Sequence, residues 1–467
     1  MSTSTPGIPR TSRLPDSASI PPFSGNEPAI VPRLFTPCDR SDYLLYLALL
    51  TLPVDGTTIG FFQPFWTPIS PWLLLVYCLA NPGLLRRTIH RYAPFLLLPI
   101  VLIYLSAAGW AAFGVHNVAI MMSLSGVIAV PATMCALDIA FIHKHLDWSE
   151  CVRIVIAAYW FAFGVGIIQW LGVHLHIDAI NSYFNHLMYR SYSTDGLWGR
   201  TVGRPQFLFA EPSYIGMHLF GILLPLHWLM RSRDSVLAQR LCVLIVVFAV
   251  GSVAMGSGTR IVLDCLIALI IIIVIRTTWH DEASRKRGIL MLLGALAITT
   301  ACFTLNSRLD SILDNGMEGD GSFFARIWQP LGPLCGLIRH PWTMLTGYGA
   351  GNIAQAAHQG ATLAVHTLTT LHTNPANAAH WYATTTPDTV WTMCLYANFL
   401  IEFGLIGFAL LFAASVRFLR RHQCAWNKTA VCWLILLVYL YIQFEGYAFA
   451  AFPLFIWVLS RSLHVHT

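Results

Sequence analysis

The stretch LAQRLCVLIVVFAVGSVAMGSGTRIVLDCLIALIIIIVIR, residues 237–276, decides the fold. It contains two apolar runs, 237–255 and 258–276, separated by a short turn of glycine and serine. Each run is long enough to cross about 30 Å of hydrocarbon as a helix. Two such runs in succession predict a pair of membrane-spanning helices.

The composition extends this prediction to the whole chain. Of its 467 residues 56% are hydrophobic and 11% are charged, and the mean hydropathy is +0.61. A soluble domain carries about 25% charged residues. We therefore predict an all-α polytopic membrane protein of about twelve spans. The predicted spans are 42–60, 64–80, 93–111, 116–138, 152–171, 212–230, 237–255, 258–276, 288–305, 389–415, 429–443 and 446–460.

The basic residues predict one orientation for these spans. Basic turns alternate with nearly uncharged turns along the chain, and all three lysines lie in or beside basic turns, at Lys144, Lys286 and Lys428. Because positive charge is retained on the cytoplasmic side, we expect both termini in the cytoplasm and two long loops, about 172–211 and 306–388, on the outer face. The net charge of +6 then indicates contact with anionic lipid and no nucleic-acid partner.

The chain divides into a tail and a membrane domain. Residues 1–40 are rich in Pro, Ser and Thr and have no apolar run, which predicts a disordered cytoplasmic tail and no signal peptide. Residues 41–467 form the transmembrane domain. Within its second long loop, 325–342 predicts a re-entrant or interfacial piece, and 352–372 predicts a helix on the outer surface.

Metal chemistry is not indicated. The eleven cysteines include no CxxC motif, so we expect neither a disulfide framework nor a zinc site. The histidine pairs His174/His176 and His464/His466 are not expected to bind a metal.

Arginines in the two outward loops are the first functional signal, because they break the charge rule that orients the protein. A planar guanidinium is suited to bidentate binding of phosphate. The outward loop arginines are Arg190, Arg200, Arg204, Arg308, Arg326 and Arg339.

The segment Arg204-Pro-Gln-Phe-Leu-Phe-Ala-Glu-Pro-Ser213 is the strongest local signal. Pro212 suits the first turn of a helix, which places Glu211 at the N-cap. Two interpretations remain open. Glu211 is either a cap paired with Arg204, or a carboxylate that serves as general base or anchors a substrate hydroxyl.

Two further segments place polar groups on the outer side. Gly256-Ser-Gly-Thr-Arg260 opens a predicted span, where an arginine either snorkels to the headgroups or binds phosphate; Asp264 is expected to form an i,i+4 pair with it. Ser322-Phe-Phe-Ala-Arg326, His340-Pro341 and Gly347-Tyr-Gly-Ala-Gly-Asn352 follow in the second loop. The glycines allow backbone N–H groups to approach an anion.

In this order, and with the closing motif Asn398-Phe-Leu-Ile-Glu402-Phe-Gly-Leu-Ile-Gly407, these segments resemble the Wzy-type polysaccharide polymerases and the related O-antigen ligases. The resemblance implies a GT-C-like fold and transfer of a glycan from an undecaprenyl-diphosphate carrier at the periplasmic face of a bacterial inner membrane. It implies no metal and no cofactor. It also makes a chain-length co-polymerase and a flippase candidate partners.

The resemblance assigns roles to individual residues. Arg204, Arg260 and Arg326 match the arginines that hold the diphosphate, with Arg190 and Arg339 as weaker additions. With Glu211 the three matching arginines are the candidate catalytic residues. The candidate substrate-binding residues are Arg190, Arg339, Ser213, Asn352, Asn398 and Glu445.

Three functions remain open at this point. A polymerase joins lipid-linked repeat units into exopolysaccharide or O-antigen, and a ligase moves the finished glycan to lipid A core or protein. Ligases of the superfamily carry a histidine just before the asparagine of the closing motif, where this chain has Ala397; His366, His372 and His380 are alternatives for that histidine. A lipid-linked oligosaccharide flippase is the third function, although the long outer loop and the sparse charge within the spans argue against it.

Overall fold

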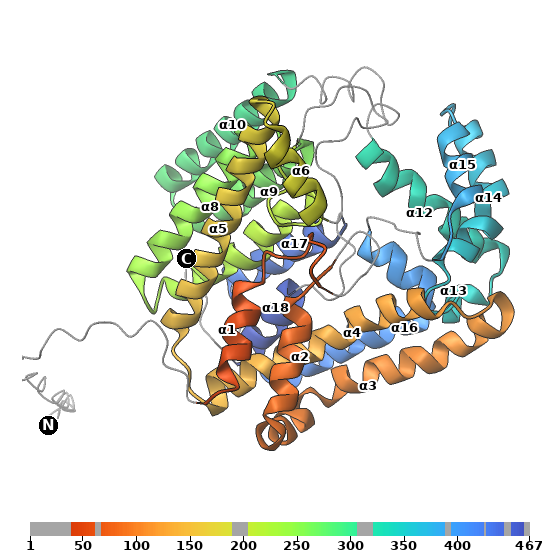
Figure 1. Ribbon diagram of the computed structural model, residues 1–467, viewed down its shortest axis with the longest axis horizontal. Coiled ribbons are helices and arrows are strands. Elements are labelled where there is room, and N and C mark those ends of the chain that lie inside the picture. The colour runs from red at the N-terminus through yellow and green to blue at the C-terminus, as the bar shows by residue number, and fades with distance from the viewer. Residues whose placement is uncertain are drawn as a thin grey trace, which may run out of the picture. The chain divides into compact units, whose positions relative to one another are not determined.

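The computed structural model describes residues 39–60, 67–188, 204–305, 321–387, 394–424, 426–442 and 450–461. Within these ranges the chain is almost entirely helical, with no strand beyond one isolated bridge between Thr57 and Met188. Of the predicted tail, only Asp39 and Arg40 are described. The protein is thus an all-α protein rich in apolar helices (Figure 1).

Among the described residues, six helical stretches are long and apolar enough to cross a membrane. They are α3 (Pro82–Phe113), α4 (Asn117–Asp138) with its extension η1 (Ile139–His143), α5 (Trp148–His174), the stretch Pro212–Met230, α8 (Ser235–Ala254) and α16 (Leu395–Arg421). Aspartates start two of them, because Asp147 accepts the backbone N–H of Ser149, and Asp234 accepts those of Val236 and Leu237.

The other predicted spans also contain helices, but these are shorter or more highly charged. They are α1 (Asp42–Leu50), α2 (Ser70–Ala80), α9 (Thr259–Arg276), α10 (Glu282–Leu305), α17 (Lys428–Ile442) and α18 (Ala451–Ser460). The predicted boundaries 42–60 and 64–80 are wrong, because α1 has 9 residues and α2 has 11. Helices of this length rise only about 14–17 Å, and residues 51–60, which follow α1, are not helical.

The stretch Pro212–Met230 is the central helix of the bundle, because 94% of its apolar window is buried inside the protein. It is also irregular. A 3-10 turn η2 (Pro212–Tyr214) leads into a π-helix η3 (Met217–Leu223) and then into α7 (Leu224–Met230). Segments of π-helix are rare and occur often at functional sites.

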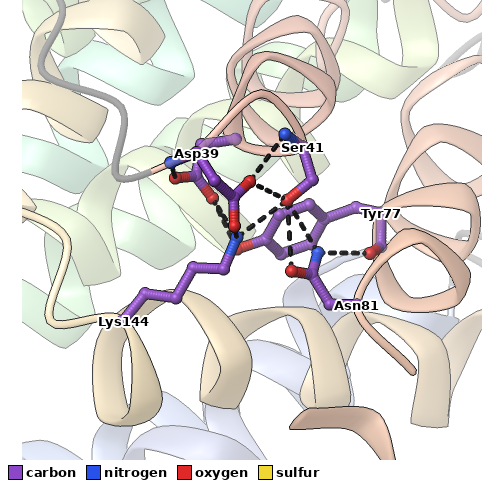
Figure 2. A network of polar contacts seen from close by, with 6 residues as sticks. Asp39, Ser41, Tyr77, Asn81 and Lys144 are labelled. Atoms are coloured by element: carbon purple, nitrogen blue, oxygen red, sulfur yellow. Dashed lines mark hydrogen bonds and ion pairs between the residues drawn. The ribbon is translucent and has the colours of Figure 1, made fainter. Parts of the chain in front are cut away.

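Lys144 joins three parts of the chain at one end of this bundle (Figure 2). Its Nζ atom lies 2.7 Å from a carboxylate oxygen of Asp39, from one of Asp42 and from the hydroxyl of Ser41. Tyr77 on α2 donates to the carboxylate of Asp42, which is fully buried. Burial raises the pKa of Asp39, but hydrogen bonds from Lys144 and Ser41 together outweigh it and bring the pKa to about 2.

The same end gathers other residues from the predicted cytoplasmic turns. The Arg233 guanidinium lies 4.7 Å from the ring centroid of Trp148, and Arg461 forms a salt bridge with Asp138. Arg91 donates to the backbone carbonyl of Ser460 at 2.7 Å. The basic turns, far apart in sequence, therefore meet in space.

The described part of the second long loop, residues 321–387, is folded into helices. They are α12 (Gly321–Arg339), α13 (Thr343–Thr346), α14 (Ile353–Thr370) and α15 (Ala376–Thr384), so the helix predicted at 352–372 is confirmed. The segment 325–342, predicted as a re-entrant or interfacial piece, overlaps most of α12, a helix of 19 residues. Figure 1 shows α12, α14 and α15 side by side, apart from α8, α9 and α10.

One short helix, α6 (Asp178–Leu187), follows α5 in the first long loop. It packs back on α5, where the Asn181 amide donates to the carbonyl of Gly172 at 3.1 Å. After Met188, which follows α6, the next described residue is Arg204.

Candidate functional site

The segment 204–210 is non-helical yet largely buried among the helices, so its backbone polar groups need partners within the protein. Gln169 of α5 supplies them at one end. Its side-chain oxygen accepts the N–H groups of Gln206 (3.1 Å) and Phe207 (2.9 Å), and its amide donates to the carbonyl of Phe207 at 2.8 Å. A buried side-chain amide thus replaces the missing helical hydrogen bonds.

Asp55 supplies partners at the other end of this segment. Its Oδ1 accepts the N–H of Ala210 at 2.9 Å, while the N–H groups of Asp55 and Gly56 donate to the carbonyl of Leu208. A Cβ on Gly56 would lie 2.1 Å from the carbonyl oxygen of Phe209, so only glycine permits this approach. The loop after α1 and the segment before η2 are therefore joined directly.

Glu211 follows this segment at the N-cap of η2, with Pro212 at the first helical position, as predicted. The Ser213 hydroxyl donates to its carboxylate at 2.9 Å, and both residues are half-buried. No side-chain capping bond is formed by Glu211. The carboxylate is thus oriented by Ser213 and not by the start of the helix. The pairing of Glu211 with Arg204, which is itself half-exposed, stays a prediction.

Arg260 lies in the first turn of α9, which packs against η2. The structure therefore brings the Glu211 and Arg260 segments together. Arg260 is only 4% exposed, so it does not snorkel to the headgroups. Its Nε lies 3.5 Å from Asp264, and within the described residues none of its guanidinium nitrogens has a hydrogen-bond partner. The neighbouring Ser257 hydroxyl is also buried without such a partner.

Asp264 connects Arg260 to two other elements, and the predicted i,i+4 pair is confirmed. Tyr439 of α17 donates to its Oδ1 at 2.9 Å. Its Oδ2 lies so close to the central helix that a Cβ on Gly216 would be 1.9 Å away. Asp264 thus sets the position of Arg260 relative to the residues that follow Ser213.

Replacing Gly216 by alanine should destabilise the protein by about 1–3 kcal/mol, because the added methyl group would displace the Asp264 carboxylate. Thermal unfolding of the purified protein in detergent would measure this. Gly83→Ala is the control, since a Cβ at Gly83 meets nothing within 4 Å. Equal unfolding midpoints for the two variants would show that the contact is not tight.

The glycine-rich segment 347–352 does not present free N–H groups to an anion. Its six amides are bound within the protein, to the carbonyls of Thr343, Ile401, Glu402 and Gly349, the Ser106 hydroxyl and the Glu402 carboxylate. The anion-binding interpretation of these glycines is therefore wrong for this structure. Close packing explains them, because a Cβ on Gly347 would lie 2.1 Å from the Glu402 carbonyl oxygen.

Asn352 and Glu402 complete this packed junction. The Asn352 amide donates to the carbonyls of Gly114 and Tyr348. Glu402, which is 1% exposed, accepts from the Ser123 hydroxyl at 2.5 Å and from the Gly351 N–H at 2.8 Å. Asn398 is buried on the same helix, α16. The geometry of this junction favours a structural role for these residues.

For most of the remaining predicted site residues, the side chain or the whole residue lies outside the described residues. Arg326 lies in α12, and its side chain is outside the described residues; Arg339 ends the same helix and is exposed. Arg190, Arg200, Arg308 and Glu445 lie outside the described residues. Figure 1 shows α12 apart from α9. The motif of Arg326 is therefore not brought together with the motif of Arg260.

Metal ligands do not gather in this region. Across the described parts of the chain there is no group of three or more His, Cys, Asp or Glu side chains that could hold a metal ion.

Sequence reasoning did not single out Gln169, His218 or Tyr159. Each is 0% exposed, and each contributes to holding the segment before Glu211. The available signal was a glutamine and a histidine within otherwise apolar predicted spans, since polar residues inside a membrane are costly and mark sites of interaction.

Comparison with known proteins found no protein-family model that matches this chain and no matching curated protein.

Proposed function

We propose that this protein is a polysaccharide polymerase of the bacterial inner membrane. It joins undecaprenyl-diphosphate-linked repeat units into exopolysaccharide or O-antigen at the periplasmic face, without a metal. One substrate donates its glycan from the lipid diphosphate, and the other offers a hydroxyl as acceptor. In this proposal the twelve apolar segments lie in the membrane and both termini are cytoplasmic.

The observation that carries the proposal is the buried Arg260 guanidinium. A buried cation whose N–H groups are unsatisfied is costly, and a single carboxylate at 3.5 Å leaves most of its hydrogen-bonding capacity unused. A bound diphosphate would satisfy it. The N-terminus of α9 favours an anion at the same place, and the Ser257 hydroxyl adds a donor.

Glu211 supplies the second half of the reaction. In the proposed step its carboxylate takes the proton of the acceptor hydroxyl, whose oxygen attacks the anomeric carbon of the donor sugar. The bond from that carbon to the diphosphate breaks, and the electron pair leaves with the lipid diphosphate. Arg260 stabilises this leaving group, with Arg204 as a further proposed contact.

The meeting of the basic turns at one end of the bundle supports the proposed orientation. Lys428 adds to it by donating to the carbonyl of Thr277, the C-cap residue of α9. Arg260 opens the same helix. The arginine therefore lies at the end of α9 opposite the lysine, as the proposal requires.

The residue just before Asn398 favours the polymerase over the ligase. Ala397 is 8% exposed and has no proton-accepting group, and the alternative histidines 366, 372 and 380 are exposed on and between α14 and α15. None of the three lies in α16 with Asn398. A base at the ligase position is thus missing from this helix.

Reconstitution tests the proposal. The purified full-length protein in proteoliposomes, supplied with lipid-linked repeat units from a strain that makes the polymer, should convert them into a ladder of carrier-linked glycans on a gel. In cells, deletion should abolish the polymer itself. Polymer that remains intact on its carrier in the deletion strain would favour the ligase.

A further inference from the structure

Three buried polar side chains from separate elements form one hydrogen-bonded chain. Tyr159 of α5 lies 2.7 Å from His218 Nδ1 in η3, and His218 Nε2 lies 3.1 Å from Asp55 Oδ2 in the loop after α1. Tyr159 and His218 are 0% exposed, and Asp55 is 3% exposed. Polar groups buried this completely must satisfy one another.

The roles of the ring nitrogens follow from these partners. The carboxylate of Asp55 is an acceptor, so Nε2 carries the proton and donates to it. In this tautomer Nδ1 accepts from the Tyr159 hydroxyl. Because both ring nitrogens are hydrogen-bonded within the protein, His218 does not act as the base toward a substrate. It acts on the site through its hydrogen bond to Asp55.

Asp55 transmits this arrangement to the segment that carries Glu211. Its second oxygen, Oδ1, accepts the N–H of Ala210, the residue just before Glu211. The His218 ring also stacks on Phe209, with 4.2 Å between ring centroids and 26° between planes. His218 therefore controls the last two residues before Glu211 by contact and through Asp55.

We propose that His218, held by Tyr159, is a positioning residue that fixes the Glu211 carboxylate through Asp55. This inference rests on the proposed function, in which Glu211 takes the proton of the acceptor hydroxyl. Diphosphate binding is proposed for a different residue, Arg260, which pairs with Asp264.

His218→Phe tests the proposal, since phenylalanine retains the stacking on Phe209 and removes both hydrogen bonds. In proteoliposomes kcat should fall at least 10-fold, while KM for the lipid-linked substrate stays within 2-fold. In a Glu211→Gln background the same change should have little further effect, because the two residues act as a unit. His218→Gln, which restores a donor toward Asp55, should recover part of kcat.

Hydrogen–deuterium exchange provides a readout that does not need activity. In His218→Phe the Ala210 amide should exchange at least 10-fold faster, whereas the Gln206 and Phe207 amides, held by Gln169, should not change. The control is His227→Phe, which removes a second histidine, itself half-buried, further along the stretch Pro212–Met230. Unchanged exchange at Ala210, or losses that add fully to those of Glu211→Gln, would overturn the proposal. A wild-type protein without polymerase activity would overturn the proposed function and leave the exchange result to stand.

Discussion

Replacing Arg260 by lysine should lower the rate of glycan polymerisation by about 10²-fold, the effect of removing one oriented donor from a developing negative charge. Lysine retains the positive charge and can still pair with Asp264, so the fold should persist. It cannot offer two parallel N–H groups to a phosphate. The measurement is the initial rate of ladder formation in proteoliposomes.

The matched control for this change is Arg276→Lys. Arg276 ends the same helix and is exposed at the opposite end, so its replacement should leave the rate unchanged. Undecaprenyl diphosphate should also raise the unfolding temperature of the wild type more than that of Arg260→Lys. A wild-type rate and a wild-type thermal shift in Arg260→Lys would exclude Arg260 from the diphosphate site.

Replacing Lys144 by methionine should destabilise the protein by about 3–5 kcal/mol, because it removes the cation beside a buried carboxylate. The Lys144 side chain is 6% exposed and that of Asp42 is 0% exposed. Methionine can fill the space of the lysine alkyl chain, so the loss of stability measures the contribution of the ion pair. Thermal unfolding in detergent, followed by light scattering or tryptophan fluorescence, measures it.

Lys286→Met is the control for this second prediction. Lys286 pairs with Glu282 at the same 2.7 Å distance, but the two side chains are 74% and 68% exposed. An exposed pair contributes about 0.2–1 kcal/mol, so the shift should be small. Similar shifts in both variants would mean that burial does not strengthen the Lys144 pair.

The sequence predicted the apolar helices and the residues at their ends better than it predicted their lengths. Glu211 before Pro212 and the Arg260–Asp264 pair depend on neighbours in sequence, and both were found where the pattern placed them. The predicted boundaries 42–60 and 64–80 were wrong, because each apolar run extends beyond the helix that it contains. Apolar composition does not distinguish a spanning helix from irregular chain buried by other parts of the protein.

The glycines of 347–352 are a second case in which the sequence pattern did not decide between two structures. A glycine-rich turn suits either an anion or a neighbouring backbone, since both require close approach without a Cβ. The structure selects the backbone, because α16 departs from helical geometry at Gly404 (φ 64°) and the turn packs against that break. Only the partner decides between the two uses, and the partner is distant in sequence.

By itself the sequence determined that this is a helical membrane protein, because the length and composition of apolar runs depend only on local residues. It also determined which short segments carry unusual charge. The tertiary structure alone decided that the segments of Glu211 and Arg260 meet, and that Gln169, Asp55 and His218 hold the chain before Glu211. Buried polar groups must find partners wherever the fold provides them, and those partners come from helices that are separated by long stretches of sequence.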